Sequence, residues 1–110
     1  MAERGVGGNG GGGVSHWLLL YDLAPDYLER RGPLRPSHLA YASGAVERGE
    51  LLLAGALVDP ADRAVFVFRC PSSEPVEEFA RADPYVTAGL VTGWQVRRWK
   101  AVVGEGAEAP

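Results

Sequence analysis

Two stretches that would be apolar on both faces as strands restrict most strongly the folds that this 110-residue sequence can adopt. They are residues 16–22 and 64–70, and both are rich in the aliphatic and aromatic side chains that favour β-strands. Successive side chains of a strand point to opposite faces of the sheet. In the first stretch the two apolar sets are Trp17, Leu19 and Tyr21 on one face, and Leu18 and Leu20 on the other. Strands of this kind are typical of the centre of a sheet that is covered on both faces.

The other predicted elements complete an order of helices and strands that is known from other proteins. They are a short helix over residues 25–31, a helix over 36–48, strands over 51–58 and 92–102, a helix ending near 82, and a helical turn over 84–89. A short turn at residues 59–63 makes the second and third strands a hairpin. The sequence therefore predicts an α+β fold of the ferredoxin-like βαββαβ type. In that topology both long helices cover one face of a four-stranded antiparallel sheet, and the first and third strands are central.

The second face of such a sheet would be bare in a monomer. An apolar face of that size is unfavourable in water. Packing two sheets face to face across a two-fold axis would bury it. We therefore expect a homodimer.

The two ends of the chain differ in composition from the rest. Residues 1–14 are rich in glycine and hold little apolar surface, so we expect a disordered tail. A phosphate-binding loop is excluded there, because no strand precedes the glycines and no Gly-Lys-Ser/Thr follows them. Residues 104–110 are small and polar and are expected to form a second, flexible tail. The predicted domain spans residues 15–103.

Charge and cysteine content narrow the classes of partner. The net charge is −3, whereas nucleic-acid-binding proteins usually carry a basic surplus. The longest uncharged apolar run, residues 51–58, is too short to cross a bilayer. No signal peptide is recognised, and the single cysteine cannot form an internal disulfide. We expect a cytoplasmic protein whose partners are small molecules or proteins, not nucleic acid or membrane.

His38 lies inside the apolar arc of the helix predicted over residues 36–48. At 100° per residue, its nearest neighbours on that arc are Ala45, Ala42, Leu34 and Tyr41. His38 is also in the first helical turn, where the positive end of the helix dipole disfavours an imidazolium. A neutral imidazole in an apolar groove suits a general base. It equally suits a core histidine that is bonded to a backbone carbonyl.

Asp83 directly precedes Pro84, and a residue before proline avoids the helical region. Asp83 is therefore well placed to cap the turn over residues 84–89 by accepting a backbone N–H. Alternatively, its carboxylate orients His38 and stabilises the charged imidazole, as in a general-base dyad. One carboxylate can fill both roles, with one oxygen for each.

The remaining candidates are weaker. Arg35, at the mouth of the His38 helix, is either a ligand for an anionic substrate or a solvated arginine. Tyr85 either closes a substrate pocket or simply packs. We expect His16 to be solvated and Cys70 to be a buried, inert thiol. With two histidines and one cysteine, a metal site has little support.

Several of these residues resemble the YciI-like family. The matching stretches are Arg35-Pro-Ser-His-Leu39, Leu52-Leu-Ala-Gly55, and Ala82-Asp-Pro-Tyr-Val86 followed by Ala88-Gly89. The resemblance spans about residues 17–100, and it implies a ferredoxin-like fold that dimerises through its sheets into an α+β barrel. It also implies an active site of one histidine and one aspartate, which fall on His38 and Asp83. One protein of similar fold is a dehydrochlorinase acting on a chlorinated hydroxyhydroquinone.

The sequence departs from the family pattern near one side of the expected pocket. Ala56 follows Gly55 where many members have proline, and the loop over residues 59–63 is short. Because that loop can border the pocket, these differences bear on the substrate and leave the histidine and aspartate in place.

Two functions are consistent with the sequence, and a third is disfavoured. The first is a cofactor-independent lyase or isomerase, dehydrochlorinase-like, in which His38 and Asp83 act on a small cyclic or phenolic substrate that Arg35 and Tyr85 help to bind. The second is a non-catalytic module of the same dimeric fold that binds a small ligand or a protein. The stretch 63–69 faintly resembles the aromatic strand of an RNA-binding sheet, but the acidic charge argues against that function.

Overall fold

The computed structural model describes residues 13–108, so residues 1–12 of the expected glycine-rich tail lie outside the described part of the chain. The elements follow one another as β2 (Ser15–Leu23), α1 (Tyr27–Arg30), the 3-10 turn η2 (Gly32–Leu34), α2 (Arg35–Glu47), β3 (Leu51–Ala56), β4 (Arg63–Cys70), α3 (Glu74–Ala82), α4 (Pro84–Thr87) and β5 (Val91–Trp99). This order confirms the predicted βαββαβ arrangement, with α1 and α4 as short additions.

The four strands form one antiparallel sheet in the order β3-β4-β2-β5. The two strands that are apolar on both faces, β2 and β4, are central, as expected. Leu19 pairs with Phe66 on one side and with Val96 on the other, which fixes the register of the middle of the sheet. The β3–β4 hairpin is present, and β3 ends at Ala56, two residues earlier than the sequence predicts.

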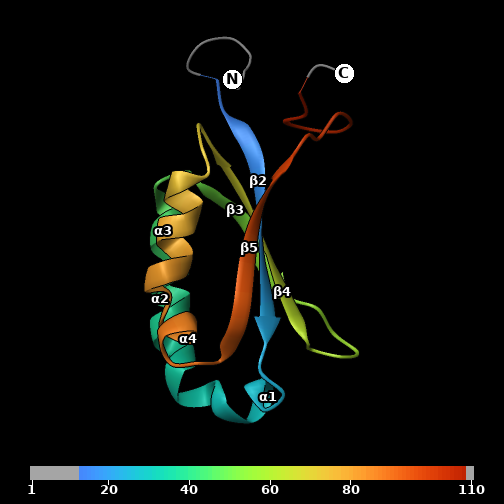
Figure 1. The fold of residues 1–110 in the computed structure, drawn as a ribbon. Coiled ribbons are helices and arrows are strands. Elements are labelled where there is room, and N and C mark those ends of the chain that lie inside the picture. Colours follow the sequence, from blue (N-terminus) through green and yellow to red (C-terminus); the bar gives the residue numbers. More distant parts are fainter. Residues whose placement is uncertain (1–12, 109–110) are drawn as a thin grey trace.

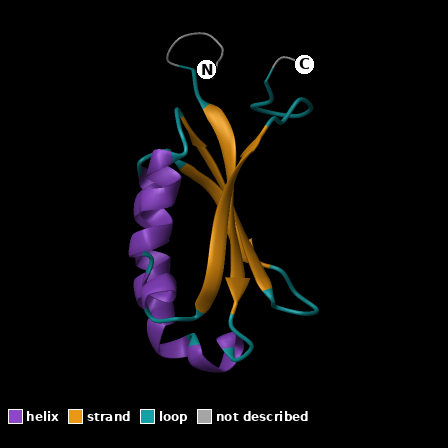
Figure 2. Ribbon diagram, viewed as in Figure 1, coloured by secondary structure: helices purple, strands orange, loops and turns teal. Residues whose placement is uncertain are grey.

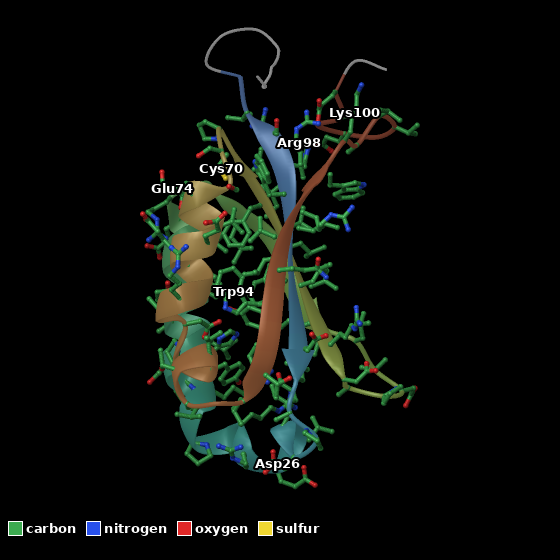
Figure 3. All side chains as sticks on the ribbon, in the orientation of Figure 1. Asp26, Cys70, Glu74, Trp94, Arg98 and Lys100 are labelled. Carbon is green, nitrogen blue, oxygen red and sulfur yellow. The ribbon has the colours of Figure 1, made fainter. Side chains whose placement is uncertain are left out.

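The core lies between the helices and one face of the sheet, which the ribbon shows as two layers (Figure 1). The strands contribute alternate residues to it, among them Leu19, Phe66 and Phe68. Helix α3 contributes Val76 and Phe79, which are three residues apart and so lie on the same side of the helix. The labelled Trp94 lies on the side of β5 that faces the helices (Figure 3).

The opposite face of the sheet is uncovered by any element of residues 13–108; all helices lie on one side (Figure 2). The strand registers pair Leu18 with Val67, Leu20 with Val65 and Leu53 with Val67. These residues alternate with the buried ones, and Leu18, Leu20, Val65 and Val67 are half-buried while Leu53 is exposed. The open face of the sheet is therefore apolar at its centre.

Residues 101–108, part of which the sequence assigns to a tail, fold back along the end of the sheet in the structure. Glu108 forms an ion pair with Arg98 at 2.8 Å, and its backbone N–H donates to Ala101 O at 2.7 Å. Gly106 lies against the ring of His16, and Figure 3 shows Arg98 and Lys100 beside this segment. The expectation of a solvated His16 is wrong, because this packing leaves the residue only 7% exposed.

None of the helices in residues 13–108 has both the length and the apolar character needed to cross a membrane. The longest, α2, has 13 residues.

Candidate active site

His38 lies in the first turn of α2 and faces the sheet. The helix begins after the 3-10 turn η2, with Pro36 in its first turn, where a missing N–H costs no helical hydrogen bond. The residue is 9% exposed. Its ring stacks on Tyr85, with centroids 3.8 Å apart and planes 7° from parallel, and meets the edge of Phe66 at 6.3 Å. Aromatic contacts on two sides therefore fix the orientation of the imidazole.

Asp83 joins α3 to α4 and is fully buried. Its backbone is extended (φ −63°, ψ 128°), as the following Pro84 favours. The side-chain Oδ1 accepts a hydrogen bond from the Tyr85 backbone N–H at 2.9 Å, so Asp83 caps α4 as the sequence predicts.

The Asp83 carboxylate has two further partners. Oδ1 lies 2.8 Å from His38 Nδ1, and Oδ2 accepts a hydrogen bond from the Tyr21 hydroxyl at 2.7 Å. The expectation of one oxygen for the cap and the other for the histidine is wrong. Oδ1 takes both contacts, since the first turn of α2 and the start of α4 meet on the same side of the carboxylate, and Oδ2 is occupied from the sheet.

Tyr21 is the member of this group that sequence reasoning missed as a site residue. Burial raises the pKa of its hydroxyl, and the charge of Asp83 raises it further, so the group stays protonated and can donate. The strand alternation already placed Tyr21 on the same face as Leu19. A buried tyrosine hydroxyl needs a partner, which is the signal that could have linked Tyr21 to the buried aspartate.

These contacts define which nitrogen of His38 carries the proton when the ring is neutral. When the Asp83 carboxylate is ionised it only accepts hydrogen bonds, so Nδ1 is then the donor toward it. The lone pair of a neutral imidazole is then on Nε2. The carboxylate orients the ring and would stabilise the positive charge formed on protonation. Chemically, this arrangement can accept a proton at Nε2.

His38 and Tyr85 line a cavity of about 900 Å³ between α2, the sheet and the β3–β4 loop. Its polar lining also includes Arg35 at the start of α2, together with Arg31 and Tyr27 from the preceding segment. Most of the remaining wall is aliphatic, with Leu39 and Val46 among the contributors. A largely apolar cavity with a few convergent polar groups is typical of a small-molecule site.

The structure brings all four sequence-predicted site residues, His38, Asp83, Arg35 and Tyr85, to this region. His38, Arg35 and Tyr85 line the cavity, while Asp83 lies behind the imidazole and is sealed from solvent. The rings of Tyr85 and Tyr27 meet edge to face at 5.7 Å, which completes an aromatic wall.

Potential metal ligands are scattered. Among residues 13–108, no three histidine, cysteine, aspartate or glutamate side chains are grouped closely enough to hold a metal ion. Cys70 is buried at the end of β4 near the start of α3 (Figure 3), away from His38 at the start of α2. Burial raises the pKa of its thiol to about 11.

Comparisons with known proteins agree with the fold of this chain. The YCII-related domain family matches residues 15–100. The proteins named YciI from Escherichia coli O6:H1 and from Shigella flexneri are each 36% identical to this chain, in alignments covering 70% of it and 88% of the relative. Among solved structures, the fold is similar to that of 5-chloro-2-hydroxyhydroquinone dehydrochlorinase (TftG) from Burkholderia phenoliruptrix AC1100, determined in complex with 2,5-dihydroxybenzoquinone. That similarity has a TM-score of 0.67 at 22% identity and covers 84% of this chain and 99% of the other.

Proposed function

The chain belongs to the YCII-related domain family, and on that premise we propose that it is a cofactor-independent enzyme of the lyase or isomerase type. Its substrate is a small cyclic or phenolic molecule bound in the cavity beside His38. The observation that carries the proposal is the contact from His38 Nδ1 to the buried Asp83 Oδ1 at the wall of this cavity. It leaves the other imidazole nitrogen to act as a base.

In the proposed reaction, His38 Nε2 removes a proton from the substrate, and Asp83 stabilises the imidazolium. In an elimination, the electron pair left by the proton forms a new double bond and an anion such as chloride departs. In an isomerisation, the imidazolium returns the proton at another carbon. General-base assistance of this kind contributes about 10²- to 10⁴-fold in rate. Arg35 and Tyr85 bind the substrate in this scheme.

The structural relative supports the choice of chemistry. TftG is a dehydrochlorinase, and its structure contains a dihydroxybenzoquinone ligand, which is a small oxygenated ring. A ring of that size fits a cavity of about 900 Å³. For this chain the elimination of chloride from a chlorinated hydroquinone is accordingly the first reaction to try.

A non-catalytic ligand-binding module is the second candidate, and one observation favours it. Asp83 also caps α4 and accepts from Tyr21, so its burial has a structural explanation that needs no chemistry. In that case His38 would complete the same buried network and the cavity would hold a ligand without turning it over.

The proposal includes a homodimer in the cytoplasm, without nucleic acid as a partner. The apolar centre of the open sheet face supports the dimer, because pairing two such faces would remove it from water. The unpaired Cys70 and the net charge of −3 support the compartment and the choice of partners.

Chloride release from a panel of chlorinated hydroquinones and phenols tests the proposed function. We expect turnover by the natural protein and a loss of about 10²- to 10⁴-fold in His38→Gln. The matched control is His16→Gln, which replaces the other histidine, outside the cavity lining. Ligand binding without turnover by the natural protein would favour the non-catalytic module. Equal turnover by the natural protein and His38→Gln would contradict the role of His38 as the base.

A further inference from the structure

The Tyr85 hydroxyl is a buried polar group without a hydrogen-bond partner in residues 13–108. The residue is 2% exposed, yet it lines the cavity beside His38. An unsatisfied buried hydroxyl costs free energy, so a hydroxyl left in this state at a cavity wall suggests that a ligand atom satisfies it. The neighbouring tyrosines differ in this respect, since the Tyr21 and Tyr41 hydroxyls donate to Asp83 and to the Phe79 carbonyl.

Two guanidinium groups line the same cavity as this hydroxyl. Arg31 and Arg35 line the same cavity, and within the described residues neither forms an ion pair with a carboxylate. Burial and the neighbouring Tyr27 raise the pKa of Tyr85, whereas Arg35, by its charge and by a close polar contact, and Arg31, by its charge, lower it. The contact from Arg35 does not reach hydrogen-bond geometry, so the hydroxyl still lacks a hydrogen-bond partner in the described residues. By contrast, the adjacent Arg30 pairs with Asp26 at 3.4 Å.

The surroundings give this part of the cavity a positive character. Arg31 is held with its guanidinium carbon 5.4 Å from the centre of the Tyr27 ring, a cation–π contact that orients it. Asp59, on the loop between β3 and β4, also lines the cavity, so two arginines and one acidic residue share the solvent-accessible lining. Arginine pairs with carboxylate and phenolate oxygens through several directed N–H groups.

We propose that Arg31, Arg35 and the Tyr85 hydroxyl form an oxyanion seat, so that the site takes a small ring compound bearing a carboxylate or a phenolate. This inference rests on the proposed function and specifies its substrate class. The guanidinium groups and the hydroxyl donate to the anionic oxygen. Because the Tyr85 ring lies 3.8 Å from the imidazole of His38, the anion is held next to the base. The seat thereby positions the ring whose proton His38 removes.

Binding of matched anionic and neutral rings tests the seat. Benzoate and benzamide, and 4-nitrophenolate and nitrobenzene, are titrated against the full chain, with NMR shift changes around His38 and Tyr85 as the readout. We expect each anion to bind about 10- to 100-fold more tightly than its neutral counterpart, as a charge-assisted contact allows. Selectivity in only the first pair would assign the seat to carboxylates, and in only the second to phenolates.

Variants separate the seat from a purely structural role. Tyr85→Phe keeps the stacked ring and removes an unsatisfied hydroxyl, so we expect weaker anion binding and no loss of stability to urea. Arg31→Gln and Arg35→Gln should each lower anion affinity at least tenfold. The control Arg81→Gln removes the same charge from α3, where Arg81 pairs with Glu77 outside the cavity, and should leave binding unchanged.

Equal binding of the charged and neutral rings, or anion affinity unaffected by these three variants, would overturn the seat. That result is distinguishable from a failure of the proposed function. His38→Gln should retain the preference for anions even when it abolishes turnover. An active enzyme without anion preference would reject the seat alone, and an inactive protein with the preference would reject the catalysis alone.

Discussion

At the scale of single residues, the buried Asp83 carboxylate organises the site. Its three donors come from different elements: the Tyr21 hydroxyl from β2, the His38 ring from α2 and the Tyr85 backbone N–H from α4. A buried charge is tolerated when it is hydrogen-bonded in this way. The contact to His38 occupies one nitrogen of the imidazole and leaves the other available, which is the arrangement a base requires.

Removing the Tyr21 hydroxyl should destabilise the fold. Tyr21→Phe leaves the Oδ2 of a buried carboxylate without its donor, and we expect the free energy of unfolding to fall by about 1 to 3 kcal/mol. Urea denaturation measures the change. Tyr85→Phe is the matched control, because its hydroxyl has no partner to lose. Equal losses in the two variants would contradict the role given to Tyr21.

At the scale of elements, the sequence predicts the strands, the helices and two members of the buried network. Periodicity in residues 16–22 and 64–70 identifies the central strands, and the proline after Asp83 identifies the cap of α4. These features depend on residues that are close together in the chain, so they can be recognised in a single sequence. The apolar arc of α2 likewise places His38 toward the sheet.

The features of the fold and site that the sequence does not predict depend on contacts between distant segments. The Tyr21 hydroxyl meets Asp83 across 62 positions of the chain, and no local pattern encodes that contact. His16 is buried because residues 101–108 fold back over it. Leu39 and Val46 are apolar residues of α2 but are 48% and 53% exposed, since they line the cavity beside the edge strand β3 and no other described element covers them.

Cys70, the last residue of β4, should react slowly with alkylating reagents while the protein is folded. Burial beneath the helical layer raises the pKa of its thiol from 9.0 to about 11, with the charge of Glu50 acting in the same direction. At about pH 8, a shift of this size lowers the thiolate fraction roughly 100-fold, so iodoacetamide should modify the folded chain at least that much more slowly than the urea-unfolded chain.

The raised pKa of the Cys70 thiol also makes the stability of the fold depend on pH. The folded state favours the protonated thiol, so this contribution to stability is complete below pH 9 and is lost as the pH rises toward 11. Rapid alkylation of the folded chain at about pH 8 would contradict the burial of Cys70.

At the scale of the whole molecule, the sheet has one face covered by helices and one open face (Figure 2), which is apolar at its centre. The candidate site lies on the covered side, between α2 and the sheet, so pairing of two open faces would leave it accessible. A homodimer would therefore bury the apolar centre of the sheet without closing the cavity from that side.

Sedimentation velocity tests this assembly. We expect a dimer at micromolar concentration, and a monomer for Leu20→Lys, which places a charge at the centre of the open face. Val103→Lys is the control, because Val103 is 89% exposed and lies outside the sheet. A natural protein that sediments as a stable monomer would rule out the sheet-to-sheet dimer.

In the proposed site, Asp83 holds His38 with its Nε2 lone pair free in the cavity. The most direct test is to determine which ring nitrogen is protonated by long-range ¹H–¹⁵N correlation NMR at mildly alkaline pH. The chain has two histidines, so the His38 signals can be assigned by comparison with His16→Gln. We predict that, when the ring is neutral, His38 carries its proton on Nδ1 and none on Nε2. A neutral His38 ring that carries its proton on Nε2 would contradict this assignment.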